Sequence, residues 1–247
     1  MIIISFLKKI ILLIIKFCFY FLYLFFISIK IPNNKKYIIY IKIAKTGGSS
    51  IVEYFRFNVG VIFLNDFIKL SKSQKYNNKK LIVIVNDQVD YFIENYSEIW
   101  NSSYIFSSIR NPISKFKSAY NYHPFCKDKR PIEVIETLKK YESYNIYGWK
   151  KNNNYKTIQK ISAYNHILYT QYKSLYRNNK KLYHYLIKIE KFDKDFLILI
   201  EKLNLKFYYS NIYKKRVNFN KKLIIFTKSE KEIIKKLFHD DYVNFNY

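Results

Sequence analysis

The chain has 247 residues, 49% of them hydrophobic, which is enough to bury the core of one α/β domain and an appendage. Its 44 Lys and Arg residues against 18 Asp and Glu give a formal net charge of +26, which attracts polyanions. Lys, Asn, Ile and Tyr are abundant throughout, so an AT-rich gene also explains the lysine excess, and charge alone names no partner. With only Cys18 and Cys126, a disulfide framework and a cysteine-based zinc site are excluded.

The first predicted element is a membrane-spanning helix at residues 10–29. This run has one charged residue, Lys16, in 20, and about 20 apolar residues of helix cross a bilayer. A cleaved signal peptide is the alternative, but no small-residue cleavage site follows the run. Lysines flank both ends, so the positive-inside rule gives no orientation. We therefore expect an N-terminal stub (1–9), an uncleaved signal-anchor (10–29), a linker (30–36) and one folded domain (37–247).

The rest of the chain alternates strands with helices, which indicates an α/β fold with a mainly parallel sheet. Short apolar runs predict buried strands at 37–43, 81–85 and 104–109, and the run 182–189 contains a further strand. Helices are predicted at 51–57, from Pro112 to about Tyr122, and at 157–176, 192–203 and 229–238, with Ser229 as the last N-cap. The polar segment 145–156 is expected to be a loop.

A glycine-containing loop, Lys45-Thr46-Gly47-Gly48-Ser49-Ser50, joins the first strand to the first helix. The glycines let the backbone approach an anion, the helix start directs N–H groups at it, and the lysine and serines add charge and hydroxyl donors. These features suit a phosphate or sulfate group, with an ordinary strand-to-helix turn as the alternative. The lysine precedes the glycines, unlike in a Walker A loop, and nothing in the loop is arranged around a magnesium ion.

A second anion-binding motif follows the third strand. Arg110-Asn111-Pro112 ends that strand, and Ser118 lies eight residues after Arg110 on a helix that begins at Pro112. An arginine at the carboxyl end of a strand and a serine on the next helix can hold one phosphate together. Taken alone, the two residues are better explained by a surface charge and a helix hydroxyl.

Together the motifs resemble those of sulfotransferases that use 3′-phosphoadenosine 5′-phosphosulfate (PAPS), most closely the Golgi-type heparan and chondroitin sulfotransferases. IKIAKTGGSSIVEYF (41–55) resembles their 5′-phosphosulfate loop, and IFSSIRNPISKFKSAY (105–120) their 3′-phosphate motif. Further along, NHILYTQ (165–171), the strand ending at Glu190 with its following helix, and the closing DYVNFNY (241–247) also resemble family segments, although Asn246 replaces a glycine. The resemblance covers 37–247 and implies a P-loop-like α/β fold.

The resemblance implies a role for each motif residue. Lys45, Thr46, Gly47, Gly48, Ser49 and Ser50 would bind the 5′-phosphosulfate, with Lys45 on the transferring sulfuryl group and the leaving oxygen. Arg110 and Ser118 would bind the 3′-phosphate. Glu190 is expected to orient the core or a loop. PAPS is the expected co-substrate, and no metal is expected.

A general base for the acceptor hydroxyl is harder to assign. Glycan-modifying relatives often place a His or Glu soon after the second strand, where this chain has Asp87-Gln88-Val89, and Gln88 is not a base. Asp87 is the first substitute and Asp90 the second. His123 and His166 are further candidates, although a structural or surface role is the expectation for each.

The sequence thus predicts a sulfotransferase that acts on a hydroxyl. We expect the acceptor to be a carbohydrate, and the positive charge of the chain favours an acidic glycan. It would be a single-pass membrane protein, in the Golgi of a eukaryote or the inner membrane of a bacterium, with no nucleic acid as partner. One alternative is a degenerate, non-catalytic membrane protein that binds polyanions. Another is a P-loop kinase, although the position of the lysine before the glycines argues against it.

Overall fold

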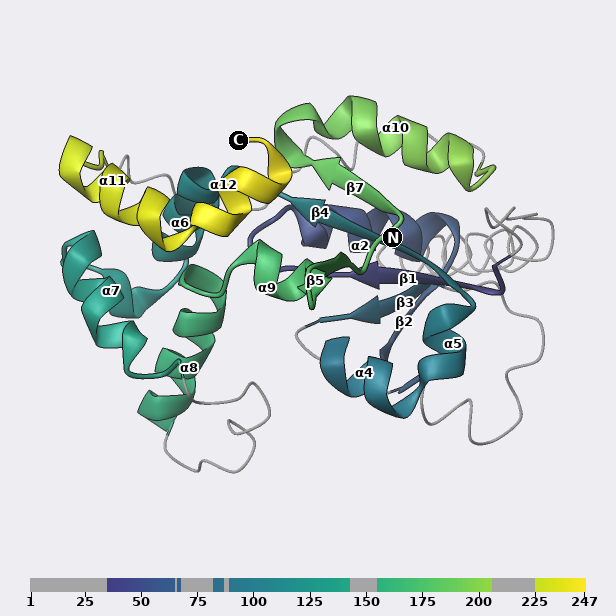
Figure 1. The fold of residues 1–247 in the computed structure, drawn as a ribbon, viewed down its shortest axis with the longest axis horizontal. Helices are drawn as coiled ribbons and strands as arrows, with labels where there is room; N and C mark the ends of the chain where they lie inside the picture. The colour runs from purple at the N-terminus through teal and green to yellow at the C-terminus, as the bar shows by residue number, and fades with distance from the viewer. Residues whose placement is uncertain (1–34, 65, 68–81, 87–88, 143–154, 206–224) are drawn as a thin grey trace, which may run out of the picture.

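The computed structural model describes residues 35–64, 66–67, 82–86, 89–142, 155–205 and 225–247 (Figure 1). The stub, the predicted membrane segment 10–29, most of the linker and nearly all of the predicted loop 145–156 lie outside these residues. Within the described part, no helix combines the length and the apolar character needed to cross a bilayer.

Five parallel strands form the central sheet, in the order β2-β3-β1-β4-β7. They are β1 (Tyr37–Ile41), β2 (Val61–Phe63), β3 (Ile82–Val85), β4 (Ser103–Ile109) and β7 (Tyr185–Lys188). The parallel sheet confirms the predicted α/β class. Chain order reverses between β1 and β4, so the loops after these two strands flank a topological switch point, where open α/β sheets bind ligands.

Helices cover both faces of the sheet, because successive side chains of a strand point to opposite faces. On β1, Ile38 and Tyr40 join one hydrophobic cluster, and Ile39 and Ile41 join the other. The first face is covered by α2 (Gly48–Asn58) and α10 (Phe192–Lys202). Residues of four shorter helices cover the second face: α4 (Val89–Asn95), α5 (Ser97–Asn101), α9 (Gln171–Leu175) and α12 (His239–Phe245).

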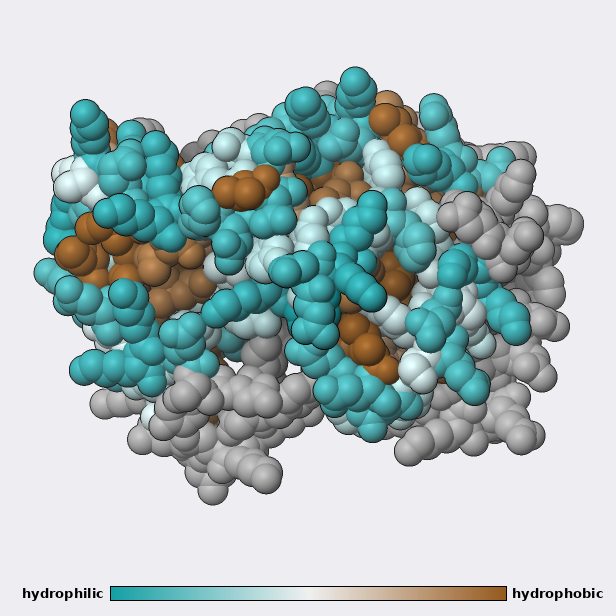
Figure 2. Space-filling model, viewed as in Figure 1, coloured by the Kyte–Doolittle hydropathy of each residue, from teal (hydrophilic) through white to brown (hydrophobic). Residues whose placement is uncertain are grey.

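A third hydrophobic cluster lies beside the sheet, to the left in Figure 1. It is formed mainly by α6 (Pro112–Tyr120), α7 (Pro131–Lys139), α8 (Tyr155–Ile167) and α11 (Lys228–Leu237). Hydrophobic side chains gather between α7 and α11 on an otherwise largely hydrophilic face (Figure 2). Because α6 starts directly after β4, this helical cluster adjoins the carboxyl edge of the sheet. Two 3-10 turns, Pro124–Cys126 and Ile189–Lys191, and the pair β5 (Tyr176–Arg177) and β6 (Lys180–Lys181) complete the described elements.

The predicted elements differ from the structure mainly in their bounds. The helix expected over 157–176 is two helices, because α8 ends at Ile167 and α9 begins at Gln171, where the Thr170 side chain accepts a hydrogen bond from the N–H of Lys173. The strand expected within 182–189 is Tyr185–Lys188, where it pairs with β4. The helices α4, α5, α7 and α12 and the strand β2 were not predicted.

The N-cap of α11 is also corrected. Thr227, not Ser229, precedes the helix, and its hydroxyl accepts a hydrogen bond from the N–H of Glu230 at 3.2 Å. The Glu230 carboxylate in turn accepts from the N–H of Thr227 at 2.9 Å, which completes a capping box. Ser229 lies in the first turn, where its hydroxyl contacts that of Thr227.

We therefore expect Thr227→Ala to lower the free energy of unfolding by about 1 kcal/mol through loss of the cap. Ser229→Ala, an exposed change of the same kind two residues away, is the matched control and should stay within about 0.5 kcal/mol of the parent. Urea unfolding curves followed by circular dichroism provide the comparison. A larger loss from Ser229→Ala would contradict this assignment.

Candidate anion-binding site

The loop after β1 has the backbone of an anion cradle. Lys45 and Gly47 both adopt the left-handed conformation, with φ of 65° and 74°. Gly47 is the N-cap of α2 and, having no side chain, makes no capping hydrogen bond, so the positive end of the helix dipole is not met by a capping side chain. A Cβ at Gly47 would lie 2.6 Å from Cδ1 of Ile189, which explains the glycine on packing grounds as well.

Buried hydroxyls anchor this loop to the sheet. The Thr46 hydroxyl donates to the carbonyl of Ile43 at 2.9 Å and lies 3.0 Å from the Ser108 hydroxyl on β4. Ser108 also contacts the Tyr40 hydroxyl at 2.7 Å. A Cβ at Gly48 would lie 2.9 Å from that same Tyr40 oxygen. The Thr46 side chain therefore holds the loop in place. If Thr46 contacts a bound anion, the contact would come from the main chain of Thr46.

The structure brings the two predicted motifs together at the switch point. The Arg110 guanidinium, at the end of β4, lies 3.5 Å from the carbonyl oxygen of Lys45 and donates to it. Ser49 is exposed and Ser50 half-buried on the first turn of α2. Ser118 is half-buried on α6, the helix that begins directly after the Arg110 turn. The two motifs, which are far apart in the sequence, thus lie in two adjacent loops and on the helices that follow them.

The Arg110 turn is clamped by a glutamine. The Gln171 side chain accepts from the N–H of Arg110 at 2.7 Å and donates to its carbonyl at 2.9 Å. Gln171 also donates to the buried Asp241 carboxylate at 3.2 Å. The next peptide is held in the same way, because the N–H of Asn111 donates to Glu190 at 2.7 Å. Glu190 thus orients a loop, in the manner expected from its place in the sequence.

Lys45 is half-buried, and its ammonium lies 3.9 Å from the centre of the Tyr122 ring. Burial, together with the nearby Arg110 guanidinium, lowers the pKa of Lys45 to about 8. Burial also lowers the pKa of Arg110, although Glu190 and Tyr247 oppose that effect. Two desolvated cations are therefore held close together, an arrangement that an anion placed between them would stabilise.

The two histidines considered as bases lie next to this lysine. Nε2 of His123, in the turn after α6, is 2.9 Å from Nδ1 of His166 on the last turn of α8. The Tyr122 ring packs against both imidazoles, with centroids 5.1 Å and 5.8 Å away. Sequence spacing gave no sign of this pair, because the two residues are 43 positions apart.

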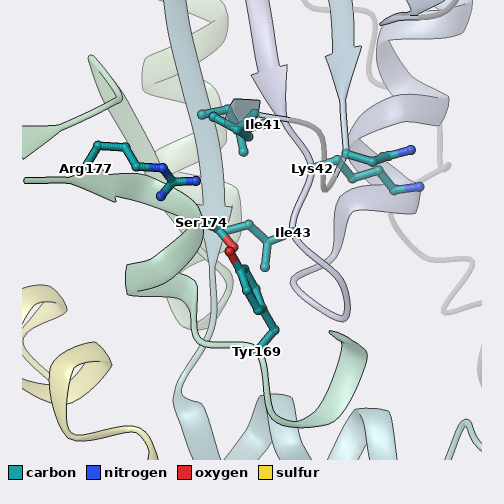
Figure 3. Close-up of a pocket in the computed structure, with 8 residues that line it drawn as sticks. Ile41, Lys42, Ile43, Tyr169, Ser174 and Arg177 are labelled. Atoms are coloured by element: carbon teal, nitrogen blue, oxygen red, sulfur yellow. The ribbon is translucent and has the colours of Figure 1, made fainter. Parts of the chain in front are cut away.

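The other candidate bases are placed differently. Asp87 and Gln88 lie outside the described residues. Asp90 forms an ion pair with Arg177 at the edge of a small hollow at the carboxyl ends of β1 and β3. Figure 3 shows Arg177 and Tyr169 directed towards Ile41 and Ile43 in this hollow, while the Lys42 ammonium points away. Among the described residues, the partner of Asp90 is Arg177 and not the Lys45 loop.

The chemistry of the assembled site is that of an anion receptor. Lys45, Arg110 and the start of α2 contribute positive charge, and serine hydroxyls contribute further donors. In the described ranges, no group of three or more His, Cys, Asp or Glu side chains could hold a metal ion. Lys115, which the sequence placed on the same helix as Ser118, is fully buried and donates to the carbonyls of His166 and Tyr169, so it holds α6 against the end of α8.

We expect Asp241→Asn to destabilise the protein by about 1–3 kcal/mol, because the amide directs N–H groups at buried donors. Asp241 is fully buried and accepts from the N–H groups of Gln171 and Tyr172. Asp240→Asn, an isosteric change at the exposed neighbouring residue, is the control and should stay within about 0.5 kcal/mol. Chemical denaturation would measure both, and equal small losses would contradict the clamp.

Anion binding should weaken above about pH 8, because the Lys45 ammonium then loses its proton. In Lys45→Arg the side chain stays charged above about pH 8, so the loss of anion affinity at alkaline pH should disappear even if the affinity is lower overall. Titrations with 3′-phosphoadenosine 5′-phosphate (PAP) from about pH 6 to pH 10 test this. An identical alkaline decline in the arginine variant would rule out Lys45 as its origin.

No protein-family model matches this sequence, and no curated protein matches it. Solved structures with similar folds include two sulfotransferases. A sulfotransferase from Alicyclobacillus acidocaldarius is 12% identical with a TM-score of 0.46, over 83% of this chain and 92% of that one. Mouse sulfotransferase SULT7A1 complexed with PAP is 13% identical with a TM-score of 0.44, over 84% of each chain. At these identities and scores, the case for function rests on the residues of the site.

Proposed function

We propose that this chain is a sulfotransferase that moves a sulfuryl group from PAPS to a hydroxyl. The observation that carries the proposal is the junction of the Lys45 loop and the Arg110 turn at the switch point of the sheet, linked by the 3.5 Å contact between Arg110 and the Lys45 carbonyl. The resemblance to PAPS-dependent sulfotransferases implies that the loop binds a 5′-phosphosulfate and the turn a 3′-phosphate. One nucleotide that carries both groups matches a site with two adjacent anion-binding loops.

Lys45 is placed to act on the transferring group. Its contact with the exposed Tyr122 ring is worth about 0.5–1 kcal/mol, whereas a hydrogen bond from an ammonium to an anionic oxygen is worth about 1.5–3 kcal/mol. Lys45 would therefore exchange the ring for an anion. As the acceptor oxygen attacks sulfur in line, negative charge develops on the oxygen that leaves with the phosphate. Lys45 and the first N–H groups of α2 would stabilise that charge.

Arg110 would hold the nucleotide in register for this step. The N–H and the carbonyl of Arg110 are both held by Gln171, and the N–H of Asn111 is held by Glu190, so little ordering of the loop remains to oppose binding. Ser118 on α6 would add a hydroxyl to the same phosphate. The residues present thus fit a bis-phosphorylated donor by charge and by hydrogen-bonding capacity.

The acceptor and the cellular setting belong to the same proposal. We favour a carbohydrate hydroxyl, and an acidic glycan among carbohydrates, because the chain carries a net charge of +26. The apolar segment 10–29 would attach the protein to a membrane, in the Golgi of a eukaryote or the inner membrane of a bacterium.

The donor site is tested by calorimetric titration of PAP into the full chain in detergent. Arg110→Ala should weaken binding about 10–100-fold, the worth of one or two hydrogen bonds to a charged group. Arg56→Ala is the control, because it makes the same charge change at the last turn of α2, the end away from the loop. Its affinity should match the parent at equal salt. Equal losses in both variants would show only diffuse charge attraction.

Activity is tested by transfer of radiolabelled sulfate from PAPS to a panel of neutral and acidic glycans. Lys45→Ala should abolish transfer while leaving the urea unfolding midpoint unchanged. Unaltered turnover in this variant would contradict the proposed mechanism. A folded protein that fails to bind PAP, yet binds heparin with a steep salt dependence, would indicate the non-catalytic polyanion-binding alternative.

A further inference from the structure

The Lys45 loop and the Arg110 turn contribute hydrogen-bond donors for the leaving phosphate, but none of these groups removes a proton from the acceptor hydroxyl. Transfer to a hydroxyl requires one. The sequence position at which glycan-modifying relatives often carry a base is Gln88 here, which does not accept a proton. The question is therefore which other basic group borders Lys45.

Lys45, His123 and His166 surround a single tyrosine ring. The Lys45 ammonium lies over one face of Tyr122, and both imidazoles pack against the same ring. Tyr122 is 57% exposed, so its side chain can rotate further into solvent without disturbing the core. The space that the ring would vacate is bordered by the lysine proposed to contact the sulfuryl group and by both imidazoles. A hydroxyl in that space would lie between sulfur and a basic nitrogen.

The two imidazoles are neutral in the free protein. Burial lowers the pKa of His123 to about 4, and Lys45 adds to the effect. Burial lowers the pKa of His166 to about 3, with contributions from His123, Lys45, Lys115 and Lys42. The hydrogen bond between the rings uses one nitrogen of each and leaves Nδ1 of His123 and Nε2 of His166 for other partners.

A bound donor reverses part of this effect. The charges that face the pair from the Lys45 loop, from the end of β1 and from α6 are all cationic: Lys45, Lys42 and Lys115. The phosphates of the donor bring negative charge to Lys45 and so favour the imidazolium. By linkage, donor binding raises the pKa of the pair, and protonation of the pair tightens donor binding. The pair is therefore most basic when the donor is in place.

We propose that the His123–His166 pair is the proton acceptor for the attacking hydroxyl, an inference that rests on the proposed sulfuryl transfer. The acceptor oxygen forms a bond to sulfur, and the bond between sulfur and the bridging oxygen of the 5′-phosphate breaks. The electron pair of that bond leaves with the oxygen, which gives PAP. The hydroxyl proton passes to a ring nitrogen of the pair, and the imidazolium then releases it to water.

Substitutions can separate this role from a purely structural one. In His123→Gln the amide occupies the position of Nε2, and in His166→Asn the amide occupies the position of Nδ1. Each variant keeps the hydrogen bond between the two side chains but removes a titrating ring. His239→Gln, at the exposed start of α12, is the matched control. Urea unfolding verifies that all three variants are folded.

The experiment is calorimetry of PAP binding to the full chain in detergent at about pH 5, in two buffers that differ in heat of ionisation. The parent and His239→Gln should take up protons on binding, whereas His123→Gln and His166→Asn should take up fewer. Protons exchanged by PAP itself are common to all proteins and cancel. In the transfer assay, the two pair variants should lose about 10²–10⁴-fold in turnover while binding PAP at about pH 7 as the parent does.

The two experiments distinguish a failure of the proposed proton acceptor from a failure of the proposed function. Parent-like proton uptake or parent-like turnover in both pair variants, with PAP still bound, would overturn the role of the pair and leave the proposed sulfotransferase intact. A folded parent that does not bind PAP would overturn the proposed function, and the role of the pair would fall with it.

Discussion

The arginine of the site depends on one buried carboxylate. Asp241, on α12 near the C-terminus, is fully buried and accepts hydrogen bonds from the main chain of Gln171 and Tyr172 and from the Gln171 side chain. A carboxylate removed from water costs several kcal/mol unless such donors surround it. Gln171, fixed in this way, pairs with both the N–H and the C=O of Arg110. The direction in which Arg110 leaves β4 is thus set by a residue 131 positions later in the chain.

The fold also holds like charges together. Burial disfavours the charged form of both Lys45 and Arg110, and the Arg110 guanidinium lowers the pKa of Lys45 further. The cost is borne by the rest of the domain, because the loop is fixed by the buried Thr46, Ser108 and Tyr40 hydroxyls rather than by attraction within the site. An anion would offset that cost on binding, and such preorganisation is how a site stabilises charge that develops in a transition state.

The features that could be predicted from the sequence are those that depend on local interactions. The strands β1, β3 and β4 and the loops after β1 and β4 were predicted, since buried runs and glycine positions are properties of short segments. The break between α8 and α9 was not, because it depends on the Thr170 cap and on tertiary bonds to Asp241. The Ser229 N-cap was wrong by two residues, since Thr227 forms the capping box with Glu230. The His123–His166 pair was invisible because its members meet only when α6 packs on α8.

The segment NHILYTQ joins the two halves of the site. His166 lies on the last turn of α8 and pairs with His123, while Gln171 begins α9 and clamps Arg110. Between them the chain leaves its helical path, and the carbonyls of His166 and Tyr169 are satisfied by the buried Lys115 ammonium. In a continuous helix, Gln171 would lie about 140° around the helix axis from His166, and both would belong to the same helix. The break instead directs His166 to the helical cluster and Gln171 to the sheet. The five-residue spacing therefore has a physical basis: it is the distance over which one short segment serves both the proposed proton acceptor and the phosphate-binding turn.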